Sequence, residues 1–231
     1  MTNSDSPSNS KSQQNANSRL MAYVIPMILF MAITWLEGRF PSAYTWIYFT
    51  KVAIVAASLL YFSREWKQEI HFDARVLPIA ILVGLAVFAE WILVDKWLPY
   101  PHLGSRTALN PFAAIPQPTL RFTFIAVRLI GLAILVPIME EVFWRSFLLR
   151  YLTDPNFWKV SIGTFSWSAF AIVAVSFGFS HTEWLAAILC AFAYGLLLRQ
   201  TRSLFACIVA HGVTNLVLGL YVLHYGAWRF W

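Results

Sequence analysis

Long apolar segments recur along the chain, and they constrain its fold more than any other feature of the sequence. A membrane-spanning helix needs about 20 mostly apolar residues, because the hydrocarbon core of a bilayer is about 30 Å thick. We assign such segments to residues 20–36, 44–62, 76–94, 122–151, 160–180, 184–199 and 204–224. The sequence therefore predicts an all-α, polytopic transmembrane helical bundle of about seven spans, within a range of six to eight.

The composition agrees with a membrane protein. Charged residues make up 12% of the chain, whereas a soluble domain carries about 25%. The basic residues lie singly or in small groups between apolar runs, without a basic cluster interleaved with aromatic residues, so we expect no nucleic-acid partner. Cys190 and Cys207 both fall inside apolar segments and form no CxxC pair, which predicts two buried free thiols.

The polar segments define the domain organisation. Residues 1–18 are rich in Ser, Asn and Gln and predict a disordered tail, and residues 19–231 form a single integral membrane domain. The link between the third and fourth spans contains several prolines and is expected to be an ordered lid or a partly re-entrant segment. Lys and Arg concentrate on the side of the N-terminus, which predicts a cytoplasmic N-terminus and, for a bacterial protein, the inner membrane.

The fourth span carries three charged residues, Glu140, Glu141 and Arg145, in the middle of an apolar run. A charge inside a bilayer costs at least about 2.5 kcal/mol, so each needs a partner or a function. Glu141 and Arg145 are four residues apart on one helix face and are expected to form a self-contained pair. Glu140 lies about 100° around the helix from Glu141, so its partner must come from another helix. Pro137 predicts a kink just before these residues.

Two other charges within the spans have simpler interpretations. Lys51 lies just inside the second span, and its long side chain is expected to extend to the interface. Glu90 lies near one end of the third span and is interpreted as an interfacial residue paired with Lys96.

The later spans supply polar side chains that could meet Glu140. His181 closes the fifth span, and Phe177, four residues earlier, could fix its ring by packing; His211 and Asn215 share one face of the seventh span. A buried carboxylate can act as a general base, and a neighbouring imidazole can share its water. A second histidine and an amide can donate to a developing oxyanion. This set suits hydrolysis of a carbonyl compound, with a peptide as the expected substrate.

At these residues the chain resembles the CPBP family of intramembrane proteases, also called the CAAX-protease and bacteriocin-processing or Abi family. The resemblance covers about residues 122–220, and the finer likeness is to small bacterial members, including those that accompany exosortase-type protein sorting. Three motifs carry it: Glu140-Glu141-xxx-Arg145, Phe177-xxx-His181 and His211-xxx-Asn215.

The resemblance implies an intramembrane endopeptidase of CAAX-protease type, acting on a membrane-associated protein or peptide. Glu140 would activate the attacking water with the help of His181, while His211 and Asn215 would stabilise the oxyanion. Three further residues would support the site: Glu141, Arg145 and Phe177.

Metal dependence is an open alternative at this point. Glu140, His181 and His211 would be the zinc ligands of a metalloprotease. We favour a metal-free, glutamate-dependent reaction without a cofactor, because Asn215 is a poor zinc ligand and is better placed in an oxyanion site with His211.

Two functions from other classes also fit a chain of this kind. One is a non-catalytic immunity or assembly protein built on the same fold, since a fold does not determine a function. The other is a proton-coupled transporter with Glu140 as its relay. Retention of every member of the three motifs favours the protease, whose partners would be the lipid bilayer and a protein or peptide substrate.

Overall fold

The computed structural model describes residues 7–104 and 108–231, and in these ranges every regular element is a helix. This confirms the all-α prediction. The longer helices are α1 (Pro7–Arg39), α2 (Tyr44–Trp66), α3 (Leu77–Trp97), α5 (Pro118–Ile130), α8 (Trp167–Phe179), α9 (Trp184–Thr201) and α10 (Leu204–Tyr225). The shorter ones are α4 (Pro111–Ala114), α6 (Val136–Glu141), α7 (Leu149–Tyr151), η1 (Pro41–Ala43), η2 (Lys67–Glu69), η3 (Ala74–Val76), η6 (Phe157–Lys159) and η7 (Trp228–Phe230).

Six helical segments in the described ranges are long and apolar enough to cross a membrane: Ser18–Arg39, Pro41–Glu69, Ala74–Trp97, Pro118–Tyr151, Trp184–Thr201 and Leu204–Tyr225. The predicted fifth span, residues 160–180, is shorter than expected, since α8 has only 13 residues. Such a helix is about 20 Å long, less than the hydrocarbon thickness. Gly163, with a φ of 82°, cannot continue a right-handed helix, so α8 starts after it. Six candidate spans and one short apolar helix lie within the predicted range of six to eight.

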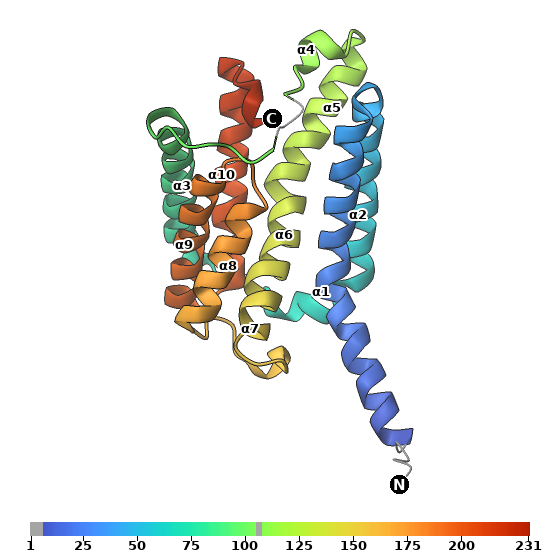
Figure 1. Cartoon of the computed structure of the whole chain (residues 1–231), viewed down its shortest axis with the longest axis vertical. Coiled ribbons are helices and arrows are strands. Elements are labelled where there is room, and N and C mark those ends of the chain that lie inside the picture. The colour runs from blue at the N-terminus through green and yellow to red at the C-terminus, as the bar shows by residue number, and fades with distance from the viewer. Residues whose placement is uncertain (1–6, 105–107) are drawn as a thin grey trace.

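The N-terminal tail also differs from the sequence prediction. Helix α1 begins at Pro7, so the part of the predicted disordered tail from Pro7 to Ser18 is helical, and residues 1–6 lie outside the described residues. Once the apolar part of α1 has nucleated the helix, each further residue adds a hydrogen bond without a new nucleation cost. Figure 1 shows this part of α1 projecting away from the bundle.

The fourth span is one continuous helical segment of 34 residues with two wide turns. Its α-helical parts α5, α6 and α7 are separated by the π-helical turns η4 (Gly131–Leu135) and η5 (Val142–Leu148). Pro137 is the second residue after η4. A proline ring crowds the carbonyl of the preceding turn and offers no amide hydrogen. The predicted kink at Pro137 therefore takes the form of a π turn, a feature that is frequent at functional sites.

The long fourth span lies at the centre of the bundle, with α1 and α2 on one side and α3, α8, α9 and α10 on the other (Figure 1). Close packing depends on glycines, as expected for membrane helices. A Cβ added to Gly212 would lie 2.6 Å from the carbonyl oxygen of Ala133, and one added to Gly84 would lie 2.5 Å from that of Ala210. These two glycines therefore allow α10 to approach both the fourth span and α3.

A buried ion pair joins the first two spans. Nζ of Lys51 lies 2.6 Å from Oε2 of Glu37, and both side chains are buried. The expectation that Lys51 extends to the interface is therefore wrong, because a carboxylate on the neighbouring helix compensates its charge inside the bundle. The predicted free thiols are confirmed, since Cys190 and Cys207 are both buried and unbridged.

Candidate active site

Glu141 and Arg145 form the ion pair that their helical spacing predicts. Nη1 of Arg145 donates to Oε1 of Glu141 at 3.1 Å, and the two side chains are 1% and 0% exposed. Glu140 and Glu141 end α6, and Arg145 lies in η5, so a π turn begins between the two members of the pair. Arg145 is therefore compensated inside the membrane by its own helix.

His211 of α10 lies between the two carboxylates, and this corrects the expectation of a self-contained pair. Its Nδ1 lies 2.8 Å from Oε1 of Glu141, the oxygen that also accepts from Arg145. Its Nε2 lies 4.0 Å from Oε2 of Glu140, and Glu140 is buried, with 5% of its surface exposed. The contact to Glu140 confirms that its side chain meets a group from another helix.

His181 follows the end of α8 and is oriented by its own chain. Its Nδ1 lies 2.8 Å from the carbonyl oxygen of Phe177 and 3.1 Å from Oγ of Ser180. Because a carbonyl oxygen only accepts hydrogen bonds, Nδ1 is the protonated nitrogen, and Nε2 of the neutral ring is an acceptor. The indole of Trp91 in α3 packs edge-on to the imidazole, with 5.8 Å between ring centroids.

The ring of Phe177 connects the parts of the site. Its centroid lies 4.5 Å from that of His181 and 6.5 Å from that of His211, and the guanidinium of Arg145 lies over its face at 4.7 Å. Phe177 is fully buried. The expectation that Phe177 packs on His181 is confirmed, and the ring also contacts the charged pair on the fourth span.

Asn215 donates a hydrogen bond to a backbone carbonyl of the fourth span. Its Nδ2 donates to the carbonyl oxygen of Leu132 at 2.9 Å. Within η4 the amide of Val136 donates to Gly131 rather than to Leu132. The next residue, Pro137, has no amide hydrogen, so the wide turn leaves the Leu132 carbonyl without its helical donor. Asn215 supplies that donor with one of its two N–H groups.

Tyr194 of α9 is a site residue to which the sequence assigned no role. Its ring lies 5.4 Å from that of His211 and 5.4 Å from the guanidinium of Arg145. Its hydroxyl donates to Oγ1 of Thr214 at 2.7 Å, and Thr214 donates in turn to the carbonyl of Gly84 at 2.7 Å. The signal available in the sequence is a tyrosine inside an apolar span, whose hydroxyl needs a partner there.

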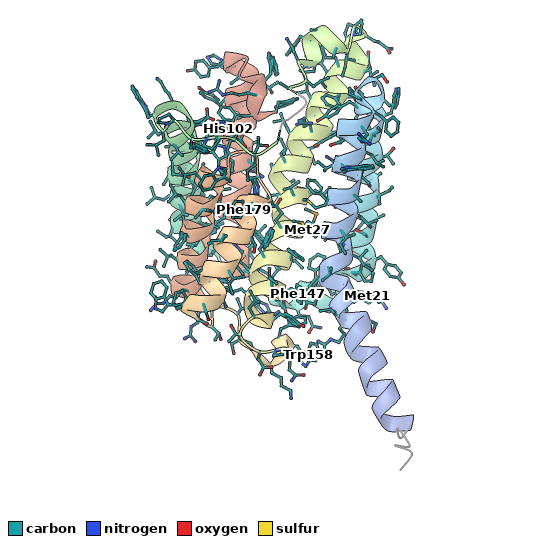
Figure 2. All side chains as sticks on the ribbon, viewed as in Figure 1. Met21, Met27, His102, Phe147, Trp158 and Phe179 are labelled. Carbon is teal, nitrogen blue, oxygen red and sulfur yellow. The ribbon has the colours of Figure 1, made fainter. Side chains whose placement is uncertain are left out.

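The link from α3 to α4 lies across the connection between α8 and α9 (Figure 1). The amide of Leu103 donates to the carbonyl of Thr182 at 3.0 Å, and the indole of Trp184 donates to the carbonyl of Pro101 at 2.8 Å. The pKa of Tyr100 is raised to about 12, first by burial and then by the carboxylates of Asp95, Glu183 and Glu90. Figure 2 shows His102 of this link and Phe179 at the end of α8. The link is ordered over residues 98–104, as a lid would be, and residues 105–107 lie outside the described part.

The three residues considered as zinc ligands, Glu140, His181 and His211, do not form a metal site in the structure. Within the described residues, no group of three His, Cys, Asp or Glu side chains is arranged so that it could hold a metal ion. Both imidazoles nevertheless direct Nδ1 to an acceptor, an orientation that metal-bound histidines share with catalytic ones. The orientation of the rings alone therefore does not distinguish the two chemistries.

Fold and site together define a class. The chain is an integral membrane protein built of helices, and its interior holds a buried carboxylate–histidine site. A comparison with protein families matches residues 122–217 to the family described as type II CAAX prenyl endopeptidase Rce1-like. Over this segment, which contains every site residue of the fourth span, α8 and α10 described above, the chain is similar to the CAAX family of intramembrane proteases.

This match supports a CAAX-type intramembrane protease in general terms, and proteases act on protein substrates. No curated protein and no solved structure matches the chain. The likeness to exosortase-associated members stays a prediction.

Proposed function

We propose that the protein is an intramembrane endopeptidase that hydrolyses a peptide bond of a membrane-associated protein or peptide, with Glu140 as the general base. The observation that carries this proposal is the position of Glu140, buried in the fourth span with its Oε2 4.0 Å from Nε2 of His211. A carboxylate and an imidazole facing each other at this distance define a place where a reacting water can contact both.

In the proposed reaction, Glu140 removes a proton from water while the oxygen adds to the carbonyl carbon of the scissile bond. His181 assists through Nε2, the acceptor nitrogen of its neutral ring. The C–N bond of the tetrahedral intermediate then breaks, and the proton held by Glu140 passes to the leaving amine. Water is consumed, a carboxylic acid and an amine are released, and the protein returns to its starting state.

The oxyanion of the intermediate is assigned to His211 and Asn215. Nδ1 of His211 is committed to Glu141, so Nε2 is the atom that faces the reaction and, when it carries a proton, donates to the oxyanion. One N–H of Asn215 is committed to the Leu132 carbonyl, and the second N–H is the donor that the proposal uses. Glu141 and the residues around it hold this arrangement.

The supporting residues act through His211 and His181. Glu141 fixes the ring orientation of His211, and Arg145 keeps Glu141 compensated for charge. Phe177 packs between the two imidazoles and under the guanidinium. Removing any of the three should lower activity without removing a reacting atom.

The cleavage test compares the wild type with Glu140→Gln, both purified in detergent and incubated with a proteome-derived peptide library and a prenylated, cysteine-terminated peptide. Mass spectrometry of new termini reports cleavage. We expect Glu140→Gln to lose at least about 10²-fold in rate, the usual contribution of general base catalysis. Glu65→Gln is the matched control, because Glu65 pairs with Arg19 at 3.3 Å on partly exposed side chains.

The outcomes separate the competing functions. Equal cleavage by the wild type and Glu140→Gln would remove Glu140 as the base. A proton-coupled transporter would instead move a solute along a gradient in proteoliposomes without new termini. An immunity or assembly protein would keep its cellular phenotype in the Glu140→Gln variant.

The proposed reaction uses no metal and no cofactor. Zinc held by Glu140, His181 and His211 would supply an activated water in the alternative mechanism. Exhaustive chelation separates the two: we expect activity to persist, whereas a complete loss that added zinc restores would establish the metalloprotease.

We further propose a cytoplasmic N-terminus and, for a bacterial source, the inner membrane. The excess of Lys and Arg on the N-terminal side supports this orientation. Reporter fusions to the segments between spans would measure it, and an extracytoplasmic signal from the segment between α2 and α3 would reverse it.

A further inference from the structure

Glu90 in α3 is a half-buried residue whose carboxyl group the proposed mechanism does not use. Both of its side-chain oxygens are shielded from solvent and make no hydrogen bond within the described residues. The predicted pairing with Lys96 is not formed, since the ammonium of Lys96 lies over the ring of Trp97 at 5.0 Å. A carboxylate in a membrane-spanning helix is expected to pair or to function.

Other carboxylates of the bundle show what a structural role looks like. Glu37 lies 2.6 Å from Lys51, and Glu141 accepts from both Arg145 and His211. Each of these carboxylates meets a charged group on its own or a neighbouring helix. Among the residues that the structure describes, Glu90 meets no such group, so the burial of its carboxyl group does not stabilise the folded protein in the same way.

The position of Glu90 places it beside the site. The next residue in α3, Trp91, packs edge-on to His181. The thiol of Cys190 in α9 lies within electrostatic range of Glu90 and also of Arg145. Tyr100, in the link across the α8–α9 connection, also interacts electrostatically with Glu90. The carboxylate therefore lies between α3 and α9, next to the groups that surround the histidines.

A peptide substrate supplies N–H donors, which the carboxyl group of Glu90 does not meet among the described residues. A peptide bond can be attacked only when its chain is extended, and an extended chain carries N–H groups that its own backbone does not satisfy. Inside a membrane each unsatisfied group costs several kcal/mol. Two buried carboxyl oxygens without partners among the described residues are acceptors for such donors.

We propose that Glu90 is a substrate-binding residue that accepts hydrogen bonds from N–H groups of the peptide next to the scissile bond. This inference rests on the proposed endopeptidase function and extends it to a second binding element outside the three motifs. Glu90 contributes to binding, while Glu140 carries out the proton transfer. Glu90 lowers the stability of the free protein, a cost that is common for groups kept for substrate binding.

The first experiment needs no substrate. Glu90→Met replaces the carboxylate by an apolar side chain of similar length, and the melting temperature is measured in detergent. We expect a rise of about 2–4 °C, since an unpartnered buried polar group is removed. Glu37→Met is the matched control in the same membrane domain, and its melting temperature should fall, because Lys51 loses its partner.

The second experiment uses the peptide that the wild type cleaves most rapidly in the library. Glu90→Met should raise KM at least about tenfold with a smaller change in kcat, because a substrate contact is lost and the base is intact. Glu90→Gln, which keeps one acceptor oxygen, should recover part of the loss. When each Glu90 substitution is added to the Glu140→Gln protein, binding of the same peptide should weaken more with Glu90→Met than with Glu90→Gln.

The outcomes keep this inference separate from the function on which it rests. If the wild type cleaves and Glu90→Met has an unchanged KM, Glu90 is not a binding residue and the endopeptidase function stands. If the melting temperature of Glu90→Met falls, the carboxylate has a structural partner and the inference is overturned. A wild type that cleaves no peptide would reject the proposed function and the role of Glu90 together.

Discussion

The contact between Asn215 and the Leu132 carbonyl allows a sharp test of how the site is built. The structure assigns this contact a cause: the wide turn before Pro137 leaves the carbonyl without an amide donor, and Asn215 replaces it at 2.9 Å. Asn215→Ala should therefore leave a carbonyl oxygen unsatisfied inside the bundle. The same substitution should have no such effect when residue 137 can donate.

The expected magnitude follows from the kind of bond. Hydrogen bonds between membrane helices contribute about 0.6 kcal/mol on average and about 1.7 kcal/mol at most. An orphaned carbonyl adds a penalty of about 1–3 kcal/mol. We expect Asn215→Ala to destabilise the protein by about 1–2 kcal/mol, which corresponds to a fall in melting temperature of about 2–8 °C for a chain of this length.

The assay is a double-mutant cycle with Pro137→Ala, read by thermal unfolding in detergent. In the Pro137→Ala protein, the amide of residue 137 or a return to regular α-helix satisfies the Leu132 carbonyl. Asn215→Ala should then cost less than about 0.5 kcal/mol, within the range of independent sites. An equal loss in both backgrounds would refute the reasoning, because it would show that Asn215 stabilises the protein through something other than this carbonyl.

Three further predictions concern other parts of the site. Arg145→Ala should lower the free energy of unfolding by about 3–5 kcal/mol, because it leaves Glu141 as a buried carboxylate without its cation; a wild-type melting temperature would contradict the pair. Tyr194→Phe should keep cleavage, whereas Tyr194→Leu should lower kcat at least about tenfold, since only the second loses the ring against His211; equal rates would show that the ring is dispensable. The pKa of Tyr100 is raised to about 12, so its neutral phenol contributes fully to the free energy of unfolding below about pH 10, and this contribution is lost as the pH rises towards 12. In Tyr100→Phe this part of the fall in melting temperature above about pH 10 should be absent.

The sequence predicts the parts of the site that lie on a single helix. The Glu141–Arg145 pair depends only on a spacing of four residues, and this spacing survives the start of a π turn between them. The shared face of His211 and Asn215 is likewise a local property of α10, and both residues contact the fourth span. Such predictions hold because helical periodicity is set by backbone geometry rather than by the neighbours of the helix.

The contacts between helices could not be predicted from the sequence, because they depend on how each helix is rotated about its axis relative to its neighbours. His211 could reach Glu140, Glu141 or both, and periodicity does not fix the rotation of α10 about its axis. The hydrogen bond of Asn215 to Leu132 could not be predicted either, because it requires the π turn that Pro137 imposes on the preceding residues. The short α8 was not predicted because residues 160–166 carry no charge and so resemble the start of a span, while Gly163 breaks the helix.

One oxygen atom of Glu141 accepts hydrogen bonds from both Arg145 and His211, and this has an evolutionary consequence. Glu141 and Arg145 compensate each other's charge and Glu141 orients His211, so substitutions at these three positions are expected to be coupled, and the three residues to be retained or lost as a group. Among relatives of this chain, a member that has replaced the histidine should also have replaced the glutamate and the arginine. Under the proposed mechanism, such a member would lack the oxyanion donor of residue 211 and would be inactive.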